Sequence, residues 1–306
     1  SKRYCRIKSP LDLVLHDECH SGSGSTTHAF YKWLRENHPK CRVIGLSATP
    51  PDISTAPDPR LSNILTRYSI YDAVKDGVIL PLKIAWIPQC NFCQDANKVV
   101  DQIAHIARKN CKDKIIVWAG TIQHCLAIAT SWSAKKAADD YFGNIVAVDT
   151  SNTSASFHNY SDFRLARKGI MFCAAKHREG SDIPHLSMAV FADGVERRTA
   201  SCFVQCVGRV LRRGRSDKKM GLVVDLCAKD GMELCDRMNM YLGLSPGSMP
   251  WDLTQRHEIR YLTLNPNKAL IQHNLKFQYL IRTIHMNLGS SLHQKIANHF
   301  QKMQDR

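Results

Sequence analysis

Two adjacent carboxylates, Asp17 and Glu18, follow the apolar run Leu11-Asp12-Leu13-Val14-Leu15 after a single residue, His16. Such a run predicts a short buried strand, so both carboxylates would stand at its carboxyl end. Carboxylate oxygens at that position can hold Mg²⁺ against the phosphates of a nucleotide, and a second carboxylate can polarise an attacking water. Acidic residues are common at strand ends, so the pair needs support from the rest of the chain.

A second predicted strand, Cys41 to Leu46, is followed by Ser47-Ala48-Thr49-Pro50. With Asp17-Glu18-Cys19-His20, this string resembles motifs II (DExH or DExD) and III (SAT) of the superfamily 2 helicases and translocases. The resemblance implies that Asp17 coordinates Mg²⁺ and that Glu18 orients the lytic water. It also implies that His20, Ser47 and Thr49 couple hydrolysis to the nucleic acid. Taken alone, the two hydroxyl residues would be interpreted as helix caps or turn residues.

Two further strings match the same family in the same order. His177-Arg178-Glu179-Gly180-Ser181-Asp182-Ile183-Pro184 resembles motif V, and Gln205-Cys206-Val207-Gly208-Arg209-Val210-Leu211-Arg212 resembles motif VI, QxxGRxxR. The resemblance implies nucleotide contacts from Gly180, Asp182, Gln205, Arg209 and Arg212, and a nucleic-acid contact from Arg178.

The spacing of the two motif VI arginines predicts a shared direction. Arg209 and Arg212 are three residues apart, so on a helix they would project from one face. Guanidinium groups there could stabilise the charge that develops during phosphoryl transfer. A basic helix face that serves only solubility is the alternative, because Arg213 and Arg215 extend the run of positive charge.

Motif I of the family, a Gly-rich phosphate-binding loop ending in Gly-Lys-Ser/Thr, does not occur in these 306 residues. The Gly/Ser-rich segment 21–27 lacks a lysine and follows motif II. The chain also starts with Ser, directly at the strand before motif II. We therefore expect a fragment of an ATP-hydrolysing helicase that is inactive by itself. A non-catalytic helicase-like subunit that binds nucleic acid or acts as a scaffold is the alternative.

The formal net charge of +15 and the sequence pI of about 9.4 favour a polyanionic partner. The endings of motifs III and V, and the string Asp76-Gly77-Val78-Ile79-Leu80-Pro81, resemble DNA-directed members, either restriction-subunit-like or from large DNA viruses. We expect DNA rather than RNA as partner, with ATP and Mg²⁺ as cofactors, no membrane association, and an intracellular setting, nuclear or cytoplasmic.

The 12 cysteines are scattered, which suits reduced thiols. Cys90-Asn91-Phe92-Cys93 is a single CxxC, for which His105, Cys111 and Cys125 are the candidate further ligands of a zinc ion.

The pattern of apolar runs predicts an α/β fold with two RecA-like parallel-sheet domains, the first incomplete. Residues 1–80 would form the rear half of domain 1, and residues 81–228 domain 2. Residues 229–306 would form a helical C-terminal extension that could bind protein partners. In domain 2, Ile115–Ala119 predicts a strand and Thr121–Trp132 the helix after it. Thr121 would then occupy the motif IV position, near the nucleic-acid backbone.

Overall fold

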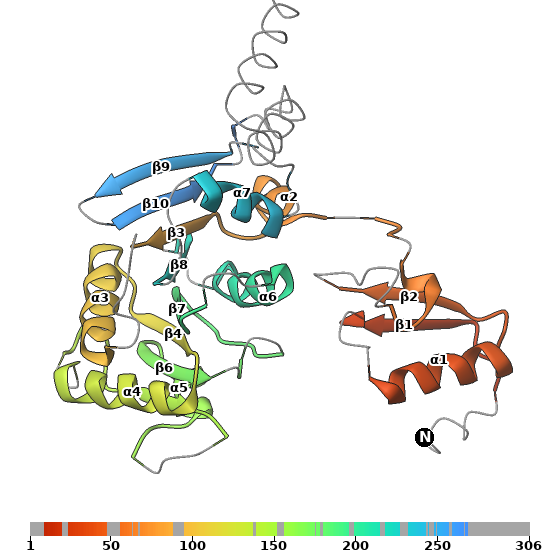
Figure 1. The fold of residues 1–306 in the computed structure, drawn as a ribbon, viewed down its shortest axis with the longest axis horizontal. Coiled ribbons are helices and arrows are strands. Elements are labelled where there is room, and N and C mark those ends of the chain that lie inside the picture. Colours follow the sequence, from red (N-terminus) through yellow and green to blue (C-terminus); the bar gives the residue numbers. More distant parts are fainter. Residues whose placement is uncertain are drawn as a thin grey trace, which may run out of the picture.

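The computed structural model describes residues 9–19, 24–47, 56–62, 64–66, 68–87, 95–136, 139–151, 156–174, 176–177, 180–195, 199–214, 218–226, 232–242, 244, 248, 250–256, 259–265 and 267–268. These residues form two separate sheets, one of two strands and one of eight. In Figure 1 the small sheet and its helix lie apart from the large sheet, and the segment that precedes α2 (Ile70–Lys75) joins them.

The small sheet pairs β1 (Leu13–Asp17) with β2 (Arg42–Leu46) in parallel, and α1 (Ser25–Asn37) connects the two strands. Tyr31 and Leu34 of α1 are buried in a core that also contains Cys19, Cys41 and Leu61. The short 3-10 helix η3 (Pro59–Ser62) packs beside β2.

One face of the small sheet has no cover among the described residues. The side chains of Leu13 and Leu15 project from β1 with 48% and 62% of their surface exposed. Parallel strands are normally buried on both faces. The small sheet therefore presents an apolar face that suits contact with further polypeptide.

The large sheet has the strand order β5-β6-β4-β7-β8-β3-β10-β9. Its strands are β3 (Leu82–Trp86), β4 (Lys114–Ala119), β5 (Val146–Asp149), β6 (Gly169–Ala174), β7 (Met188–Ala192), β8 (Gly221–Asp225), β9 (Trp251–Arg256) and β10 (Ile259–Leu264). The six strands from β5 to β3 are parallel, and β10 and β9 continue the sheet antiparallel. The central strands β4, β7 and β8 are buried along their whole length, because helices cover both faces.

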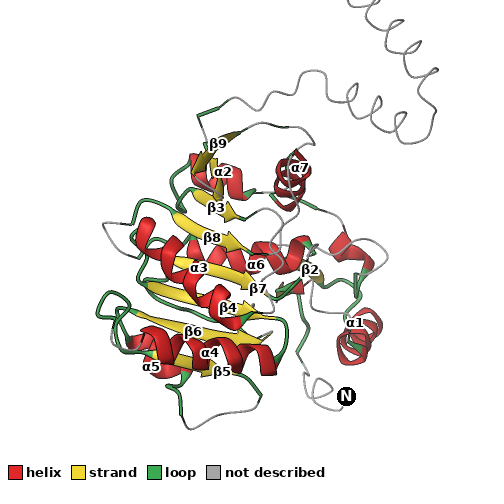
Figure 2. Ribbon diagram, turned by 60° about the vertical axis from the view of Figure 1, so that its left-hand side comes forward, coloured by secondary structure: helices red, strands yellow, loops and turns green. Residues whose placement is uncertain are grey.

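Two layers of helices enclose this sheet, as Figure 2 shows. Helices α3 (Ala96–Lys109) and α4 (Ile122–Lys136) supply the core on one face. The core on the other face contains residues of α2, α5 (Tyr160–Leu165), α6 (Ala200–Val210) and α7 (Met232–Tyr241). The predicted α/β class with a RecA-like parallel sheet is confirmed by this arrangement.

The structure corrects the expected helical extension after residue 228. Only α7 is helical among the described residues there, while β9 and β10 form a hairpin on the edge of the large sheet. In β10, Tyr261 and Leu262 are both buried while Arg260 and Thr263 are partly exposed, so side-chain burial does not follow a period of two. Pairing with β3 and β9 is what makes this segment a strand. Residues 269–306 lie outside the described part of the chain.

Candidate active site at the ends of two sheets

The acidic pair stands at the carboxyl end of β1. Asp17 is the last residue of the strand, and the Glu18 amide donates to Asp17 Oδ1 at 3.0 Å. Glu18 has φ +52°, in the left-handed region that non-glycine residues seldom adopt. Both side chains are exposed. A strained turn that is fixed by a hydrogen bond and presents two carboxylates to solvent is typical of a functional site.

Helix α1 fixes the strand that carries this pair. The hydroxyl of Tyr31 lies 2.6 Å from His16 Nδ1, directly before Asp17. Burial raises the pKa of Tyr31 to about 12, so the phenol stays protonated at neutral pH. This contact ties the end of β1 to α1 through an uncharged phenol.

The strand register brings motif III beside motif II. Asp17 pairs with Leu46, so Glu18 and Ser47 leave the sheet at the same edge. The structure thus supports the predicted proximity of Ser47 to the acidic pair. The other two predicted coupling residues, His20 and Thr49, lie outside the described residues.

The predicted motif VI residues lie on or just after α6. Gln205 is half-buried within the helix, and Arg209 is buried in its last turn with 8% exposure. The helix ends at Val210 with Leu211 as C-cap, so Arg212 lies in the following turn. The expectation that one helix face carries both arginines is therefore wrong, because the helix stops between them.

Both arginines contact the loop that contains motif V. Arg209 Nη1 donates to the carbonyl oxygen of Ser181. Arg212 Nη1 lies 2.6 Å from Asp182 Oδ1, in an ion pair whose side chains are more than half exposed. Gly180 has φ +68°, and a Cβ there would meet nothing within 4 Å, so the loop is open to solvent at this point. Arg178 lies outside the described residues.

The charge of Glu18 makes a small electrostatic contribution at the buried arginine. Burial lowers the pKa of Arg209, and the neighbouring Arg212 lowers it further, whereas Cys206, Tyr160 and, least of the three, Glu18 act to raise it. Glu18 follows β1 of the small sheet and Arg209 belongs to α6 on the large sheet. Figures 1 and 2 both show α6 on the side of the large sheet toward β1 and β2.

A lysine that the sequence did not single out holds the end of α6. Lys218 is buried, and its Nζ donates to the carbonyl oxygens of Leu186, Val210 and Arg212 at 2.6, 2.7 and 3.0 Å. A cation at a helix C-terminus satisfies the last carbonyl groups and complements the helix dipole. Lys218 comes eight residues after Val210 and belongs to none of the motifs, so the sequence did not predict this role.

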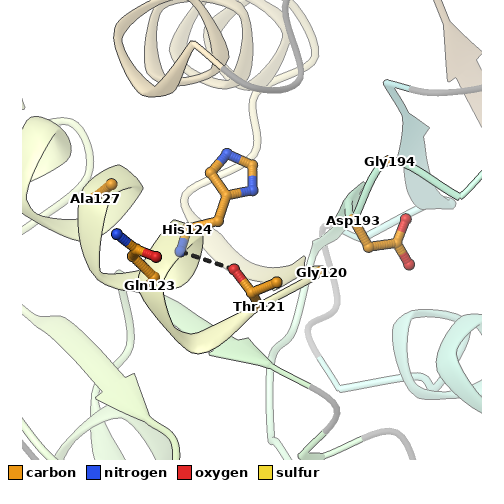
Figure 3. A pocket seen from close by; sticks show the side chains of 7 residues that line it. All are labelled: Gly120, Thr121, Gln123, His124, Ala127, Asp193 and Gly194. Atoms are coloured by element: carbon orange, nitrogen blue, oxygen red, sulfur yellow. Dashed lines mark hydrogen bonds between the residues drawn. The ribbon is translucent and has the colours of Figure 1, made fainter.

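Thr121 lies at a different place from the acidic pair and the arginines. It follows β4 and caps α4, with His124 N donating to Thr121 Oγ1 at 3.1 Å. Figure 3 shows it in a cavity of about 530 Å³, which is lined by Gly120, Thr121, Gln123, His124, Ala127, Asp193 and Gly194. Burial lowers the pKa of His124, which favours its neutral form. This cavity lies at the carboxyl ends of neighbouring strands β4 and β7, where α/β sheets bind ligands.

One carboxylate that could hold a magnesium ion, Asp17, stands at the end of β1. Among the described residues, no group of three or more His, Cys, Asp or Glu side chains is placed to hold a metal. Mg²⁺ needs only one or two carboxylates when phosphates and waters complete its shell, and Asp17 can supply one. Cys90 and Cys93 lie outside the described residues, and Cys125 is buried with its pKa raised to about 12.

No helix among the residues described above has both the length and the apolarity needed to cross a membrane. The cysteines in the same part of the chain carry free thiols.

No family model and no curated protein matches the sequence. Solved structures do match its fold. A fragment of a putative HsdR subunit of a type I restriction enzyme from Vibrio vulnificus YJ016 has a TM-score of 0.58 and 20% identity, over 77% of this chain and 47% of that one. S. cerevisiae Dbp5 bound to RNA and ADP BeF3 has a TM-score of 0.51 and 16% identity, over 79% of this chain and 60% of Dbp5.

A third neighbour is Mss116p bound to ssRNA and AMP-PNP, with a TM-score of 0.51 and 13% identity over 76% of this chain and 46% of that one. The chain therefore spans 46 to 60% of the length of these three structures. Sequence identities this low establish similarity of fold and nothing about function. On that level the comparison agrees with the sheet topology, and the chain has the RecA-like fold of helicase domains.

Proposed function

We propose that this chain is part of an ATP-dependent helicase or translocase that hydrolyses ATP between its two sheets. The observation that carries the proposal is the placement of α6, which contains Arg209, on the side of the large sheet toward the small sheet, whose strand β1 ends in the acidic pair. A carboxylate that can activate water and a guanidinium that can stabilise phosphoryl charge are thereby directed to a common region.

The roles of the residues follow from their positions. Asp17 would hold Mg²⁺, which would supply positive charge beside the phosphates of the nucleotide. Glu18 would accept a proton from, and orient, the attacking water. Arg209 and Arg212 would contact the γ-phosphate, and for that Arg212 must exchange Asp182 for phosphate, which the exposure of this ion pair permits. Gln205, Gly180 and Asp182 would border the nucleotide.

Coupling to the nucleic acid would run through the residues next to the acidic pair. Ser47 emerges beside Glu18, and we propose that it acts with His20 and Thr49 when the nucleotide state changes. Closure around ATP and opening after hydrolysis would move the sheets relative to each other, which is a shift between states of different nucleotide affinity.

In this proposal the phosphate-binding loop would come from polypeptide outside these 306 residues, because the sequence contains none. The exposed Leu13 and Leu15 face of β1 is where a further helix of the first domain could pack. This supports the interpretation of the small sheet as an incomplete RecA-like domain.

The nucleic-acid partner is proposed to be DNA rather than RNA, on the resemblance of motifs III and V to DNA-directed helicases. Strand contacts would go mainly to phosphates, with Thr121 and Arg178 among them, and the net charge of +15 favours such binding. A helicase-like subunit that binds nucleic acid without hydrolysis is the alternative, favoured by the lack of the phosphate-binding loop.

The test measures ATP hydrolysis by the longest natural polypeptide that contains this chain, with and without single-stranded DNA or RNA. We expect stimulation by DNA, and loss of at least about a hundredfold in kcat for Glu18→Gln, since an activating carboxylate is removed. Glu36→Gln is the matched control, because Glu36 forms only an exposed contact with Lys32 on α1. If neither DNA nor RNA stimulates ATP hydrolysis, the proposed helicase or translocase function is refuted. If Glu18→Gln keeps full activity, the proposed role of Glu18 in activating water is refuted.

A further inference from the structure

The imidazole of His177 joins two segments that are far apart in sequence. Its Nε2 lies 2.7 Å from Asp149 Oδ2 at the end of β5, and its Nδ1 lies 2.6 Å from Ser181 Oγ. The side chain is only 9% exposed. It stacks on the ring of Tyr160 with centroids 4.4 Å apart.

The direction of these hydrogen bonds follows from the partners. Burial acts to raise the pKa of Asp149, but hydrogen bonds from Lys176 and His177 outweigh it, so the pKa is lowered and the carboxylate stays ionised. An ionised carboxylate can only accept, so Nε2 of the imidazole carries a proton and donates. In the neutral ring, Nδ1 is then the acceptor for the Ser181 hydroxyl.

Lys176 holds the Asp149 carboxylate, which accepts the hydrogen bond from His177, in place. Its Nζ lies 2.6 Å from Asp149 Oδ1 and 3.1 Å from the Thr150 carbonyl oxygen, and its own carbonyl accepts from Trp118 Nε1 at 3.0 Å. His177 itself has φ +60°, a backbone conformation that costs free energy in a residue with a side chain. The surrounding contacts hold the residue in this conformation.

The other end of the chain of contacts is Arg209. Ser181, whose hydroxyl engages His177, offers its carbonyl oxygen to Arg209 Nη1. The next residue, Asp182, has its carbonyl oxygen held by Tyr160 Oη at 3.0 Å and by Arg164 Nε at 3.2 Å. A continuous set of hydrogen bonds thus runs from β5 to the guanidinium that interacts with Glu18.

We propose that His177 is a positioning residue for the Arg209 guanidinium, acting through Ser181 with Asp149 as its anchor. This rests on the proposed function of Arg209. The imidazole fixes the Ser181 hydroxyl and so the direction of the adjoining carbonyl, and this carbonyl sets where the guanidinium points before phosphate arrives. Preorganised donors stabilise a transition state more than donors that must reorient during the reaction.

The kinetic test compares His177→Phe with wild type in the longest natural polypeptide that contains this chain. Phenylalanine keeps the stacking on Tyr160 and removes both hydrogen bonds. We expect kcat for ATP to fall by about tenfold or more with KM changed by less than about twofold, because the lost interaction acts in the transition state. His28→Phe on the exposed side of α1 is the matched control.

Two further variants separate positioning from general destabilisation. With Arg209→Lys already present, adding His177→Phe should change kcat by less than about twofold, since both changes disable one unit. If the fall in kcat of the double variant equals the product of the falls in the two single variants, the proposal is overturned. Ser181→Ala should lower kcat, as His177→Phe does, and Ser181→Thr, which keeps the hydroxyl, should restore it. If His177→Phe does not fold, this pair of Ser181 variants tests the positioning role instead.

A spectroscopic measurement on the 306-residue chain is independent of ATP hydrolysis. With isotope-labelled arginine, the Arg209 guanidinium, assigned through Arg209→Lys, should rotate slowly in wild type and faster in His177→Phe and Ser181→Ala. Unchanged rotation in both variants would refute the positioning role even if the protein hydrolyses ATP. Faster rotation in a protein without polymer-stimulated hydrolysis would leave the positioning role standing and refute the proposed function.

Discussion

The carboxylate of Asp58 anchors the small sheet to its helix, and its removal should loosen the part of the chain that carries the acidic pair. The side chain is fully buried. It accepts hydrogen bonds from Arg35 Nη1 at 2.8 Å and from Arg60 Nε, Nη2 and main-chain N at 2.8 to 3.0 Å. Arg60 also donates to the carbonyl oxygen of Cys41, directly before β2.

The expected cost of Asp58→Asn follows from burial. Removing one partner of a buried ion pair typically costs about 3–5 kcal/mol. The two arginine side chains are 48% and 33% exposed, so water can solvate them in the variant. We therefore expect about 3 kcal/mol, the lower end of that range. The matched control is Asp101→Asn, whose pair with Lys135 is exposed and should contribute at most about 1 kcal/mol.

The effect should depend on pH. Burial acts to raise the pKa of Asp58, but the hydrogen bonds from Arg60 and Arg35 outweigh it and the pKa is lowered. A carboxyl group of this kind stabilises the folded state above its unfolded pKa of about 4 and ceases to do so as pH falls through its folded pKa. The difference between wild type and Asp58→Asn should thus be full at pH 7 and shrink below pH 4.

Hydrogen exchange measured by mass spectrometry tests this locally. Peptides from α1 and β2 should lose protection in Asp58→Asn by the factor that corresponds to about 3 kcal/mol, roughly a hundredfold, while peptides from β4 and β7 keep theirs. Equal protection in wild type and Asp58→Asn, or equal losses in Asp58→Asn and Asp101→Asn, would show that the buried carboxylate does not hold this part of the fold together.

Two other changes probe the large sheet. Burial lowers the pKa of Lys218 to about 8, so between pH 8 and about 10.4 the unfolded chain binds more protons than the folded one. The stability of wild type relative to Lys218→Met should therefore rise across that window, by at most about 3 kcal/mol, in urea unfolding at pH 7.5 and pH 10. A constant difference would contradict the assigned burial effect. Gly169 has φ +142° and a Cβ there would lie 2.8 Å from the Ile145 carbonyl oxygen, so Gly169→Ala should cost about 1–3 kcal/mol. Thermal unfolding tests this, and an unchanged midpoint would refute it.

The sequence alone predicted the elements whose patterns are local. A continuous apolar run predicted β4, because a strand covered on both faces needs apolar side chains on both. The helix after β4 was also predicted, and α4 extends it to Lys136. The apolar run that ends at Leu15 likewise placed Asp17 and Glu18 at the end of a strand, since the run and the two carboxylates are close together in the sequence.

Local patterns failed where the decisive partner is distant. Arg209 and Arg212 have helical spacing, but Lys218 binds the carbonyl oxygens at the end of α6 and the chain turns before Arg212. β10 becomes a strand by pairing with β3, which is more than 170 residues earlier in the chain.

The amino-acid sequence by itself determined which chemical groups this protein carries and the order in which strands, loops and helices present them. Only the tertiary structure decided which of them meet. That the charge of Glu18 reaches Arg209, and that Asp149, His177 and Ser181 form one hydrogen-bonded chain, depends on the packing of two sheets and of β5 beside β6. The contact of Asp149 with His177 joins residues 28 positions apart, and its free energy exists only after the chain has folded.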